Sequence, residues 1–373
     1  MKYDKFFLKY AFNIANLGKF TTTPNPNVGC IVVINNYIIG EGYHQNKGNF
    51  HAEINALNMA GKKAKNATIY VTFEPCSHYG ETPPCINKLI SFGIKRIVIS
   101  ILDPNPKISG NGFSFLKKKK IIVNNNIIIN KNEKINIGFL KRMRIGFPKI
   151  TLKLASSIDG CTGMKNKESK WITSKKSRKD VQCFRAENDA ILSSSTTIIS
   201  DNSTINIKRS NLTKNIKDIY YKKKLRQPIK IIIDNYNLIK PFYKIIQNKT
   251  NIWLIRTKKD KLIWPKKTKQ IILPTQKNKK NLDLVLLMIQ LGEKQINNVW
   301  IETGYNLSGS LLTNGLIDEF ILYIAPKLLG NKTLPLFKIS NLKKINEAIY
   351  FKIKNIKKIE KDIRIRLKPN IKY

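Results

Sequence analysis

Hydrophobic positions near the start of the chain recur with the spacing of an amphipathic helix. The pattern begins at Asp4, a residue suited to cap a helix, and ends at Gly18, a residue type common just past helix ends. The expected apolar face comprises Phe6, Phe7, Tyr10, Ile14 and Leu17. The pattern therefore predicts a first helix that packs one face against a core.

Short apolar runs and helical segments then alternate up to about residue 145. Runs at 30–34 and 37–42 flank Asn35-Asn36 and predict a β-hairpin. The other expected elements are strands at 68–73, 95–101 and 121–129, helices beginning near His51 and Cys85, a basic helix through 141–144, and loops at 103–106 and 110–112. Strands that alternate with helices imply an α/β layer sandwich.

A second pattern begins at Gly146-Phe147-Pro148, which we interpret as a domain boundary. A strand is expected at 150–156, and Ser174 is suited to cap a helix through Arg185. The remaining predictions are strands at 189–192, 229–234, 252–255, 299–302 and 320–324, and a polar surface loop at 208–227. We therefore expect two domains, residues 1–145 and 146–373.

Length and composition agree with two domains. The chain has 373 residues, more than one typical domain, and 42% of them are hydrophobic. No segment is long and apolar enough to cross a bilayer, and the N-terminus lacks the pattern of a signal peptide. Five cysteines, an odd number, indicate a reducing compartment. We expect a cytoplasmic protein without a membrane partner.

The formal net charge is +44, a value that ordinarily indicates nucleic-acid binding. Lysine is spread along the whole chain together with Ile and Asn, including the runs 117–120 and 277–280. A codon pool rich in A and T would produce the same excess. A solvated basic surface is therefore favoured over a specific nucleic-acid site, with weak non-specific binding expected at low salt.

The densest group of metal-binding residue types lies between His51 and Cys85. It contains His51-Ala52-Glu53 and the segment that runs from Glu74 through Cys76 to Cys85. One imidazole and two thiolates give Zn²⁺ three protein ligands and leave the fourth tetrahedral position open for water. Such a water loses its proton near neutral pH, and Glu53 is placed to hand that proton to a leaving amine. The pattern predicts a catalytic zinc site.

The expected local structure fits this chemistry. Residues i and i+2 do not share a helix face, so His51 and Glu53 reach one metal only at the first turn of a helix. Pro83 and Pro84 predict the start of a further helix, whose dipole would stabilise the Cys85 thiolate. A structural zinc site with His78 as fourth ligand is the alternative. The H-A-E triplet and the missing C-x-x-C favour the catalytic site.

Two further segments are suited to binding small molecules. The loop from Thr21 to Gly29 is rich in amides and hydroxyls that can read the polar edge of a heterocycle, although a plain turn is equally compatible. The segment from Val299 to Leu312 reads as strand, glycine turn and helix, and N–H groups at such a helix start bind phosphate. It lacks the G-x-G-x-x-G pattern, so an ordinary strand-to-helix turn is the favoured interpretation.

Together the motifs resemble the bifunctional deaminase/reductase family of riboflavin biosynthesis. In the first half H-A-E is followed by E-P-C-S-H-Y-G-E-T-P-P-C, preceded by T-P-N-P-N-V-G-C and followed by D-P-N-P. In the second half the resemblance continues at 138–142, 152–160, 171–174 and 324–330. It covers essentially the whole chain, and the C-x₈-C spacing differs from the C-x-x-C of cytidine and tRNA deaminases.

The resemblance implies an N-terminal cytidine-deaminase-like three-layer α/β/α domain and a C-terminal dihydrofolate-reductase-like α/β domain. The first would deaminate 2,5-diamino-6-(5-phosphoribosylamino)pyrimidin-4-one to 5-amino-6-(5-phosphoribosylamino)uracil with one zinc ion per chain. The second would reduce the ribosyl side chain to ribityl with NADPH. A small-molecule substrate, no specific nucleic acid and a homo-oligomeric state are expected.

The resemblance also implies roles for individual residues. The implied zinc ligands are His51, Cys76 and Cys85, and the implied proton shuttle is Glu53. The implied NADP contacts are Ala155, Trp171, Thr197, Asp201, Gly304, Tyr305, Asn306, Leu307, Ser308, Gly309 and Ser310. The implied substrate contacts are Ser169, Arg185, Ile205, Lys208 and Glu302. Lys153 is a candidate for polarising the sugar carbon.

This chain departs from the family pattern at several positions. Asn202, Ser203 and Lys208 lie where the family usually reads D-D-P-x-L-x-x-R, and Glu81 replaces a basic residue before T-P-P-C. The nucleotide turn reads Gly304-Tyr305-Asn306 where Gly-Pro-Thr or Gly-Gly is usual. Two alternatives remain: a nucleic-acid-editing deaminase, which leaves the second domain unexplained, and an RNA-binding protein on a decayed enzyme fold, which predicts lost site residues.

Overall fold

The computed structural model describes residues 2–104, 110–125, 127–166, 168, 170–220, 225–275, 282–340 and 342–370. The chain forms two compact units, Met1–Gly146 and Phe147–Tyr373. Among the described residues, no helix combines the length and apolar character needed to span a membrane.

The first unit contains a five-stranded sheet with the order β2-β1-β3-β4-β5. Its strands are β1 (Gly29–Ile34), β2 (Tyr37–Tyr43), β3 (Thr68–Val71), β4 (Arg96–Ile99) and β5 (Ile122–Asn124). β1 pairs antiparallel with β2 and β3, whereas β3, β4 and β5 are parallel. The predicted hairpin is confirmed, with Asn35 and Asn36 at positive φ as a tight two-residue turn requires.

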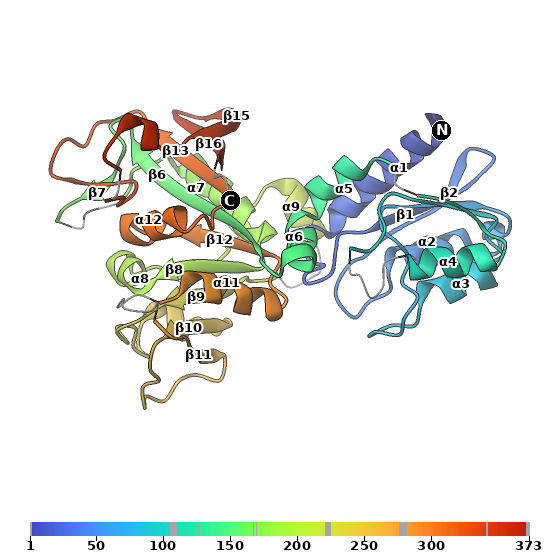
Figure 1. Cartoon of the computed structure of the whole chain (residues 1–373), viewed down its shortest axis with the longest axis horizontal. Coiled ribbons are helices and arrows are strands. Elements are labelled where there is room, and N and C mark those ends of the chain that lie inside the picture. Colours follow the sequence, from blue (N-terminus) through green and yellow to red (C-terminus); the bar gives the residue numbers. More distant parts are fainter. Residues whose placement is uncertain are drawn as a thin grey trace. The chain divides into compact units, whose positions relative to one another are not determined.

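Helices cover both faces of this sheet. They are α1 (Lys2–Ala15), α2 (Ala52–Ala60), α3 (Cys85–Ser91), α4 (Asn111–Lys118), α5 (Ile129–Ile135) and α6 (Ile137–Ile145). One core cluster joins α2, α3 and α4 to the sheet through residues such as Leu57, Leu89 and Leu116, and Figure 1 shows these three helices together. A second cluster joins α1 to the opposite face through Phe7 and Leu8. The three-layer α/β/α prediction is confirmed.

The prediction for the buried face of the first helix was right about Phe7 and Ile14 and wrong about the other three residues. Phe6 is 61% exposed, and Tyr10 and Leu17 are also exposed; the buried face comprises Phe7, Leu8, Ala11, Phe12, Ile14 and Ala15. Asp4 is no cap, because it lies inside α1 and forms an ion pair with Arg96 at 2.9 Å. The buried face mixes large residues such as Phe7 and Phe12 with Ala11 and Ala15, and the apolar spacing alone did not identify it.

Other boundaries in this unit also shifted. The expected strand at 121–129 shrinks to β5, since the chain turns into α5 at Ile129. The expected loop at 110–112 is the beginning of α4, with Gly110 as its N-cap. Pro84 is the N-cap residue of α3 rather than its first helical residue, and Cys85 takes that first position.

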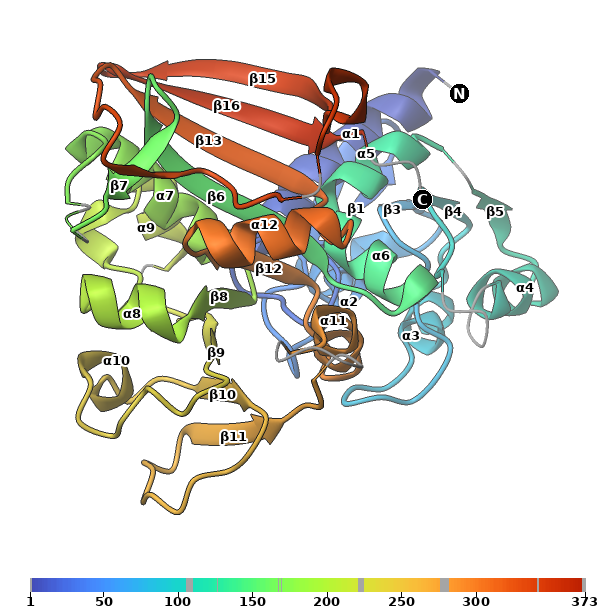
Figure 2. The ribbon, with the colours of Figure 1, turned by 60° about the vertical axis from the view of Figure 1, so that its left-hand side comes forward.

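The second unit contains a nine-stranded sheet with the order β11-β10-β9-β8-β12-β6-β13-β16-β15. Its strands are β6 (Lys149–Ser157), β8 (Ala190–Ser194), β9 (Ile229–Ile233), β10 (Ile252–Arg256), β11 (Thr268–Ile272), β12 (Asn298–Glu302), β13 (Glu319–Ala325), β15 (Phe351–Ile359) and β16 (Asp362–Pro369). All neighbours pair in parallel except β13 with β16 and β16 with β15. Figure 2 shows β15, β16, β13 and β6 side by side.

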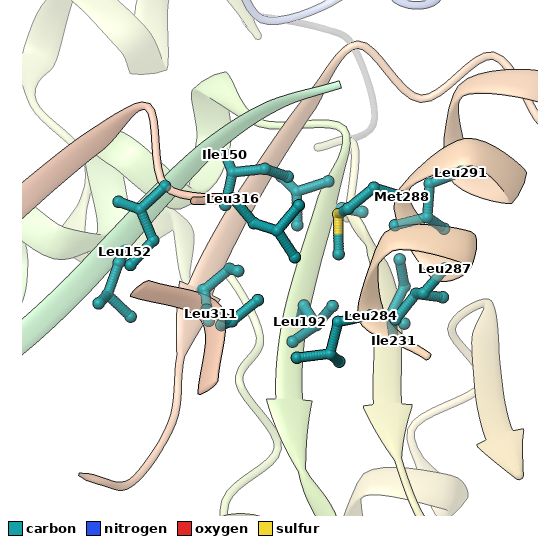
Figure 3. Packing of buried hydrophobic residues seen from close by; sticks show 14 of the residues in the cluster. Ile150, Leu152, Leu192, Ile231, Leu284, Leu287, Met288, Leu291, Leu311 and Leu316 are labelled. Carbon is teal, nitrogen blue, oxygen red and sulfur yellow. The ribbon is translucent and has the colours of Figure 1, made fainter. Parts of the chain in front are cut away.

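Helices again pack on both faces. They are α7 (Lys175–Glu187), α8 (Ser195–Asp201), α9 (Lys214–Ile219), α10 (Lys244–Gln247), α11 (Leu284–Glu293) and α12 (Tyr305–Thr313). On one face, Leu287 and Met288 of α11 and Leu311 of α12 pack on Leu192 and Ile231 of the sheet (Figure 3). On the other face, α7 covers a cluster that includes Ile191, Trp300 and Tyr323. A short ribbon, β7 (Cys161–Met164) with β14 (Thr333–Pro335), completes the unit.

The predictions for this unit held where apolar runs were continuous. All six expected strands are present, and the Ser174 hydroxyl caps α7 by accepting a hydrogen bond from the Ser177 N–H at 3.2 Å. The polar stretch 208–227 was wrongly predicted to be loop throughout, since it contains α9. The antiparallel pair β15–β16 was not predicted, because lysines dominate its alternation.

Candidate active sites

The first candidate site is built from two helix starts and one loop. His51 is the N-cap residue of α2, Cys85 is the first residue of α3, and Cys76 lies in the loop after β3. The His51 Nδ1 atom lies 3.4 Å from the Cys76 Sγ atom and 3.2 Å from the Cys85 Sγ atom. The ligand atoms of these three residues all lie within 4.8 Å of one another. The structure thus brings together the three residues predicted to bind zinc.

The donor set suits Zn²⁺, because two thiolates and one imidazole are its preferred ligands and leave one tetrahedral position for water or substrate. Within the described residues, His78 is exposed and is not part of the cluster. The described residues therefore do not form the alternative structural zinc site, in which His78 would be the fourth ligand. The three-ligand arrangement is that of a catalytic centre.

Hydrogen bonds already polarise the thiols. The Cys85 thiol, the His51 ring and the Cys85 backbone N–H, which is 3.3 Å from the Cys76 Sγ atom, lower the pKa of Cys76 to about 4. The neighbouring Cys76 thiolate and burial raise the pKa of Cys85 instead. The N-termini of α2 and α3 add positive potential that favours anionic ligands at this point.

Glu53 lies in the first turn of α2 and is 3% exposed. Burial raises the pKa of its carboxyl group to about 7. A carboxyl group with this pKa can both accept and donate a proton near neutral pH, which is the property required of a proton shuttle. The expected position at a first helical turn is confirmed.

A wall of the zinc site comes from residues that sequence reasoning did not single out. The His44 ring packs edge-on against the His51 ring with centroids 5.2 Å apart. The His44 Nδ1 atom is 3.3 Å from the Phe50 carbonyl oxygen, so it donates there and leaves Nε2 to accept from the Asn25 amide at 2.9 Å. The amide-rich loop from Thr21 to Gly29 pointed to Asn25 as a possible contact. Nothing in the sequence around His44 indicated its position beside His51.

The rim of this site contains the departure noted at Glu81. Its carboxylate pairs with Lys47 at 3.1 Å, and both side chains are about half exposed. An exposed pair of this kind contributes little to stability. At position 81, where the family usually has a basic residue, this chain therefore has a carboxylate that pairs with Lys47 of a neighbouring loop.

The second candidate site is centred on Glu302 at the end of β12. The Arg185 guanidinium donates to both Glu302 carboxylate oxygens, at 2.6 and 2.8 Å, and the Trp300 indole N–H donates at 2.7 Å. Burial acts to raise the pKa of Glu302, but Arg185 and Lys153 together hold it at about 2. Two residues expected to contact substrate, Arg185 and Glu302, are thus locked to each other.

Lys153 stands beside this pair, because β6 and β12 place it opposite Glu302 in register. Burial lowers the pKa of Lys153, while Glu302 opposes that shift. Its ammonium lies 6.0 Å from the centre of the Tyr323 ring. The candidate for polarising the sugar carbon therefore faces the same group of charged residues.

Ile205 and Lys208 lie in a loop that contacts the Arg185–Glu302 pair through Asn206. The Asn206 carbonyl accepts from Arg185 at 3.5 Å, and the Asn206 side chain accepts from the buried Lys230 ammonium. The Lys208 backbone N–H donates to Gln182 at 2.9 Å, while the Lys208 side chain is exposed. Ile205 is buried. Ser169, also expected to contact substrate, lies outside the described residues.

The expected cofactor contacts gather around the start of α12. Gly304 is its N-cap residue, and the Gly304 N–H donates to the Thr197 hydroxyl at 3.1 Å. Tyr305, Asn306, Leu307, Ser308, Gly309 and Ser310 form its first two turns rather than a loop. The Ser308 hydroxyl is buried and has no hydrogen-bond partner among the described residues. The exposed Gly304 N-cap suits a phosphate group.

The other expected cofactor contacts are spread over three segments. Ala155 lies on β6 and Asp201 ends α8. Trp171 is 64% exposed, and the Arg178 guanidinium lies over its ring at 4.2 Å. The Asp201 carbonyl oxygen accepts from the Lys170 ammonium at 2.5 Å, which ties the Trp171 segment to the end of α8.

A cytidine-deaminase-like unit with a His-Cys-Cys centre, joined to an α/β unit with a helix start suited to phosphate, defines a two-domain deaminase/reductase. Family models agree: residues 1–101 match the cytidine and deoxycytidylate deaminase zinc-binding region, and residues 148–365 match the RibD C-terminal domain. The chain belongs to the RibD family of riboflavin-biosynthesis proteins, which combines a zinc-dependent deaminase with an NADPH-dependent reductase. This assignment replaces the RNA-binding and nucleic-acid-editing alternatives.

Individual relatives support the family over the full length. The Escherichia coli K12 riboflavin biosynthesis protein RibD is 47% identical over 345 residues, covering 92% of this chain and 94% of that protein. The diaminohydroxyphosphoribosylamino-pyrimidine deaminase of Buchnera aphidicola subsp. Acyrthosiphon pisum is 57% identical over 145 residues, covering 39% of this chain and 99% of that protein. The Acinetobacter baumannii RibD structure is 36% identical with a TM-score of 0.89, covering 99% of each chain.

Proposed function

We propose that residues 1–145 deaminate a phosphoribosylaminopyrimidine and that residues 146–373 reduce the resulting uracil derivative. The first substrate would be 2,5-diamino-6-(5-phosphoribosylamino)pyrimidin-4-one and the second 5-amino-6-(5-phosphoribosylamino)uracil. A Thermotoga maritima structure described as a deaminase/reductase of these compounds is 26% identical with a TM-score of 0.84, covering 99% of each chain. The observation that carries the proposal is the His51, Cys76 and Cys85 cluster with Glu53 buried beside it.

In the deaminase, His51, Cys76 and Cys85 would hold the zinc ion. When bound, zinc supplies a Lewis acid that makes water a nucleophile at neutral pH. Glu53 takes the proton that the water loses and delivers it to the departing amino nitrogen. Its carboxyl group is buried, and polar groups of the loop from Thr21 to Gly29 would contact the pyrimidine edge.

In the reductase, the N-terminus of α12 and Thr197 would hold the phosphates of NADPH, with Ala155, Trp171 and Asp201 as further contacts. When bound, NADPH supplies the hydride. Arg185 and Glu302 would orient the sugar hydroxyls. Lys153, which lies opposite Glu302, would polarise the sugar carbon that is reduced.

The 5′-phosphate of the reductase substrate would be bound by Lys208, whose exposed side chain is anchored through its backbone contact with Gln182. Ile205 would pack against the heterocycle, and Ser169 would add a hydroxyl contact. We also propose a cytoplasmic, homo-oligomeric enzyme. All five cysteines are unpaired, as is usual for proteins of a reducing compartment.

The test is incubation of the purified chain with the diaminopyrimidine substrate, with and without NADPH, followed by mass analysis. We expect the uracil derivative alone without NADPH and its ribityl form with NADPH. About one zinc per chain is expected by elemental analysis. A zinc-free active enzyme, or a product that retains both ring amino groups, would contradict the proposal.

A further inference from the structure

A buried carboxylate lies close to the zinc ligands without being one of them. Glu74 is two residues before Cys76 and is 7% exposed. One of its oxygens accepts from the backbone N–H groups of Asp103 at 2.9 Å and Gly110 at 3.1 Å, and the other accepts from Phe113 at 3.2 Å. Every partner of this carboxylate in the described part of the chain is therefore a backbone N–H group.

Two of these donors belong to the start of α4. Gly110 is the N-cap residue of this helix and has no side chain to satisfy the free N–H groups of the first turn. The Glu74 carboxylate supplies the missing acceptors from a distant segment, and its charge suits the positive end of the helix. Hydrogen bonds of this charged type are shorter and about twice as strong as neutral ones.

The same helix start lies directly on the loop that contains Cys76. A Cβ atom built on Gly112 would lie 2.5 Å from the Pro75 carbonyl oxygen, so this position admits glycine alone without displacement. Pro75 joins Glu74 to Cys76 in the chain. The Glu74–Cys76 turn is thus held against α4 both by the carboxylate and by close backbone contact.

The other side of Cys76 is held by α3. The Ile86 N–H donates to the Cys76 carbonyl at 3.4 Å, and the Cys85 N–H donates to the Cys76 sulfur. Upstream, the Glu74 N–H donates to the Ile101 carbonyl at 3.0 Å, which continues the pairing of β3 with β4. The Glu74 side chain and α4 therefore complete a set of contacts that holds the turn from several sides.

We propose that Glu74 is the positioning residue of the zinc centre: its carboxylate clamps the turn that carries Cys76 onto the start of α4. This inference rests on the proposed function, because it takes Cys76 as a zinc ligand. It assigns Glu74 no contact with zinc, water or substrate. Outer residues that orient metal ligands commonly change metal affinity by about 10- to 100-fold when replaced.

The decisive variant is Glu74→Gln, which preserves the shape of the side chain. Its amide group places an NH₂ donor against backbone N–H groups and removes the negative charge. We expect zinc to transfer to a competing chelator about tenfold faster than from the wild type. We also expect faster hydrogen exchange of the amides at 110–116, measured by mass spectrometry, with reduction of the uracil substrate unchanged.

Glu133→Gln is the matched control, since Glu133 forms an exposed ion pair with Arg144 in the same unit. It should leave zinc transfer and amide exchange at wild-type values. Gly112→Ala tests the clamp without touching the carboxylate and should also accelerate zinc transfer. It decides the question if Glu74→Gln does not fold.

Two failures are distinguishable. A wild-type chain that binds no zinc would overturn the proposed function itself. A zinc-binding wild type whose Glu74→Gln and Gly112→Ala variants release zinc at the wild-type rate would overturn the role of Glu74 alone.

Discussion

The zinc centre and the reductase site differ in how far apart their residues lie along the chain. His51 and Cys85 are 34 positions apart, whereas the Arg185–Glu302 pair spans 117 positions. The zinc centre uses two helix starts and one loop that follow each other in sequence. The reductase site combines residues of α7, β12 and β6 with a loop. A site whose residues are close in sequence can be recognised as a sequence motif. A site whose residues are far apart in sequence can be recognised only in the folded structure.

The electrostatics differ in the same way. In the zinc centre, burial raises the pKa of Glu53 to about 7, because the neighbouring groups do not supply enough positive charge to offset it. In the reductase site, Arg185 and Lys153 overcome burial and hold the pKa of Glu302 at about 2. One carboxyl group is prepared to move a proton, and the other to remain a fixed anion.

The largest expected effect is on the local site. Glu53→Ala should retain zinc and lose deamination by a factor on the order of 10² or more, because the proton shuttle is removed. Reduction of the pre-deaminated uracil substrate should be unaffected, and it serves as the control for folding. If both activities vanish together in a folded variant, the two sites are not separable and the comparison fails.

A smaller effect is expected on the stability of the dispersed site at low pH. The pKa of Glu302 is about 2 in the folded chain against an ordinary value of 4.5. Its contribution to stability, about 3 kcal/mol, is therefore complete above about pH 4.5 and is lost as the pH falls toward 2. Glu302→Gln should lower the free energy of unfolding at pH 6, and the difference from wild type should shrink below pH 4.

Tryptophan fluorescence during urea unfolding checks this prediction. Trp171, Trp253, Trp264 and Trp300 are the four tryptophans of the chain, and all of them lie in the second unit. The signal therefore reports on the unit that contains Glu302. A difference between wild type and Glu302→Gln that stays constant from pH 6 to pH 3 would show that this pKa shift does not stabilise the fold.

Lys208→Ala should raise the KM for the phosphorylated reductase substrate about tenfold, equivalent to one charged hydrogen bond. Lys208→Arg should lower that KM, because a guanidinium can bind two phosphate oxygens at once. The KM for NADPH should change little in either variant. Steady-state kinetics that show an unchanged substrate KM in Lys208→Ala would leave this residue as one more solvated lysine.

The smallest effect is expected at the rim of the zinc site. Glu81→Gln breaks the exposed pair with Lys47 and should change the free energy of unfolding by less than about 1 kcal/mol. Zinc content should be unchanged, because neither residue is a ligand. Loss of zinc in this variant would show that the local site extends to its rim and is less self-contained than the motif suggests.

The sequence by itself predicted the residues of the candidate zinc site, which the fold brings together, and the main strands. His51, Glu53, Cys76 and Cys85 were readable because metal chemistry restricts both residue type and spacing. Continuous apolar runs predicted β6, β8, β9, β12 and β13, since parallel strands buried on both faces have no polar alternation. The reductase contacts were reached through family resemblance alone.

The tertiary structure decided what depends on neighbours distant in sequence. Helical periodicity could not identify the whole buried face of α1, because Asp4 is buried through its ion pair with Arg96 and its hydrogen bond with Tyr70. Nothing near Glu74 in the sequence shows that its oxygens accept N–H groups from the start of α4. The mutual locking of Arg185 and Glu302 exists because adjacent strands and α7 bring them together. Such pairings are properties of strand order and packing, which a local pattern does not contain.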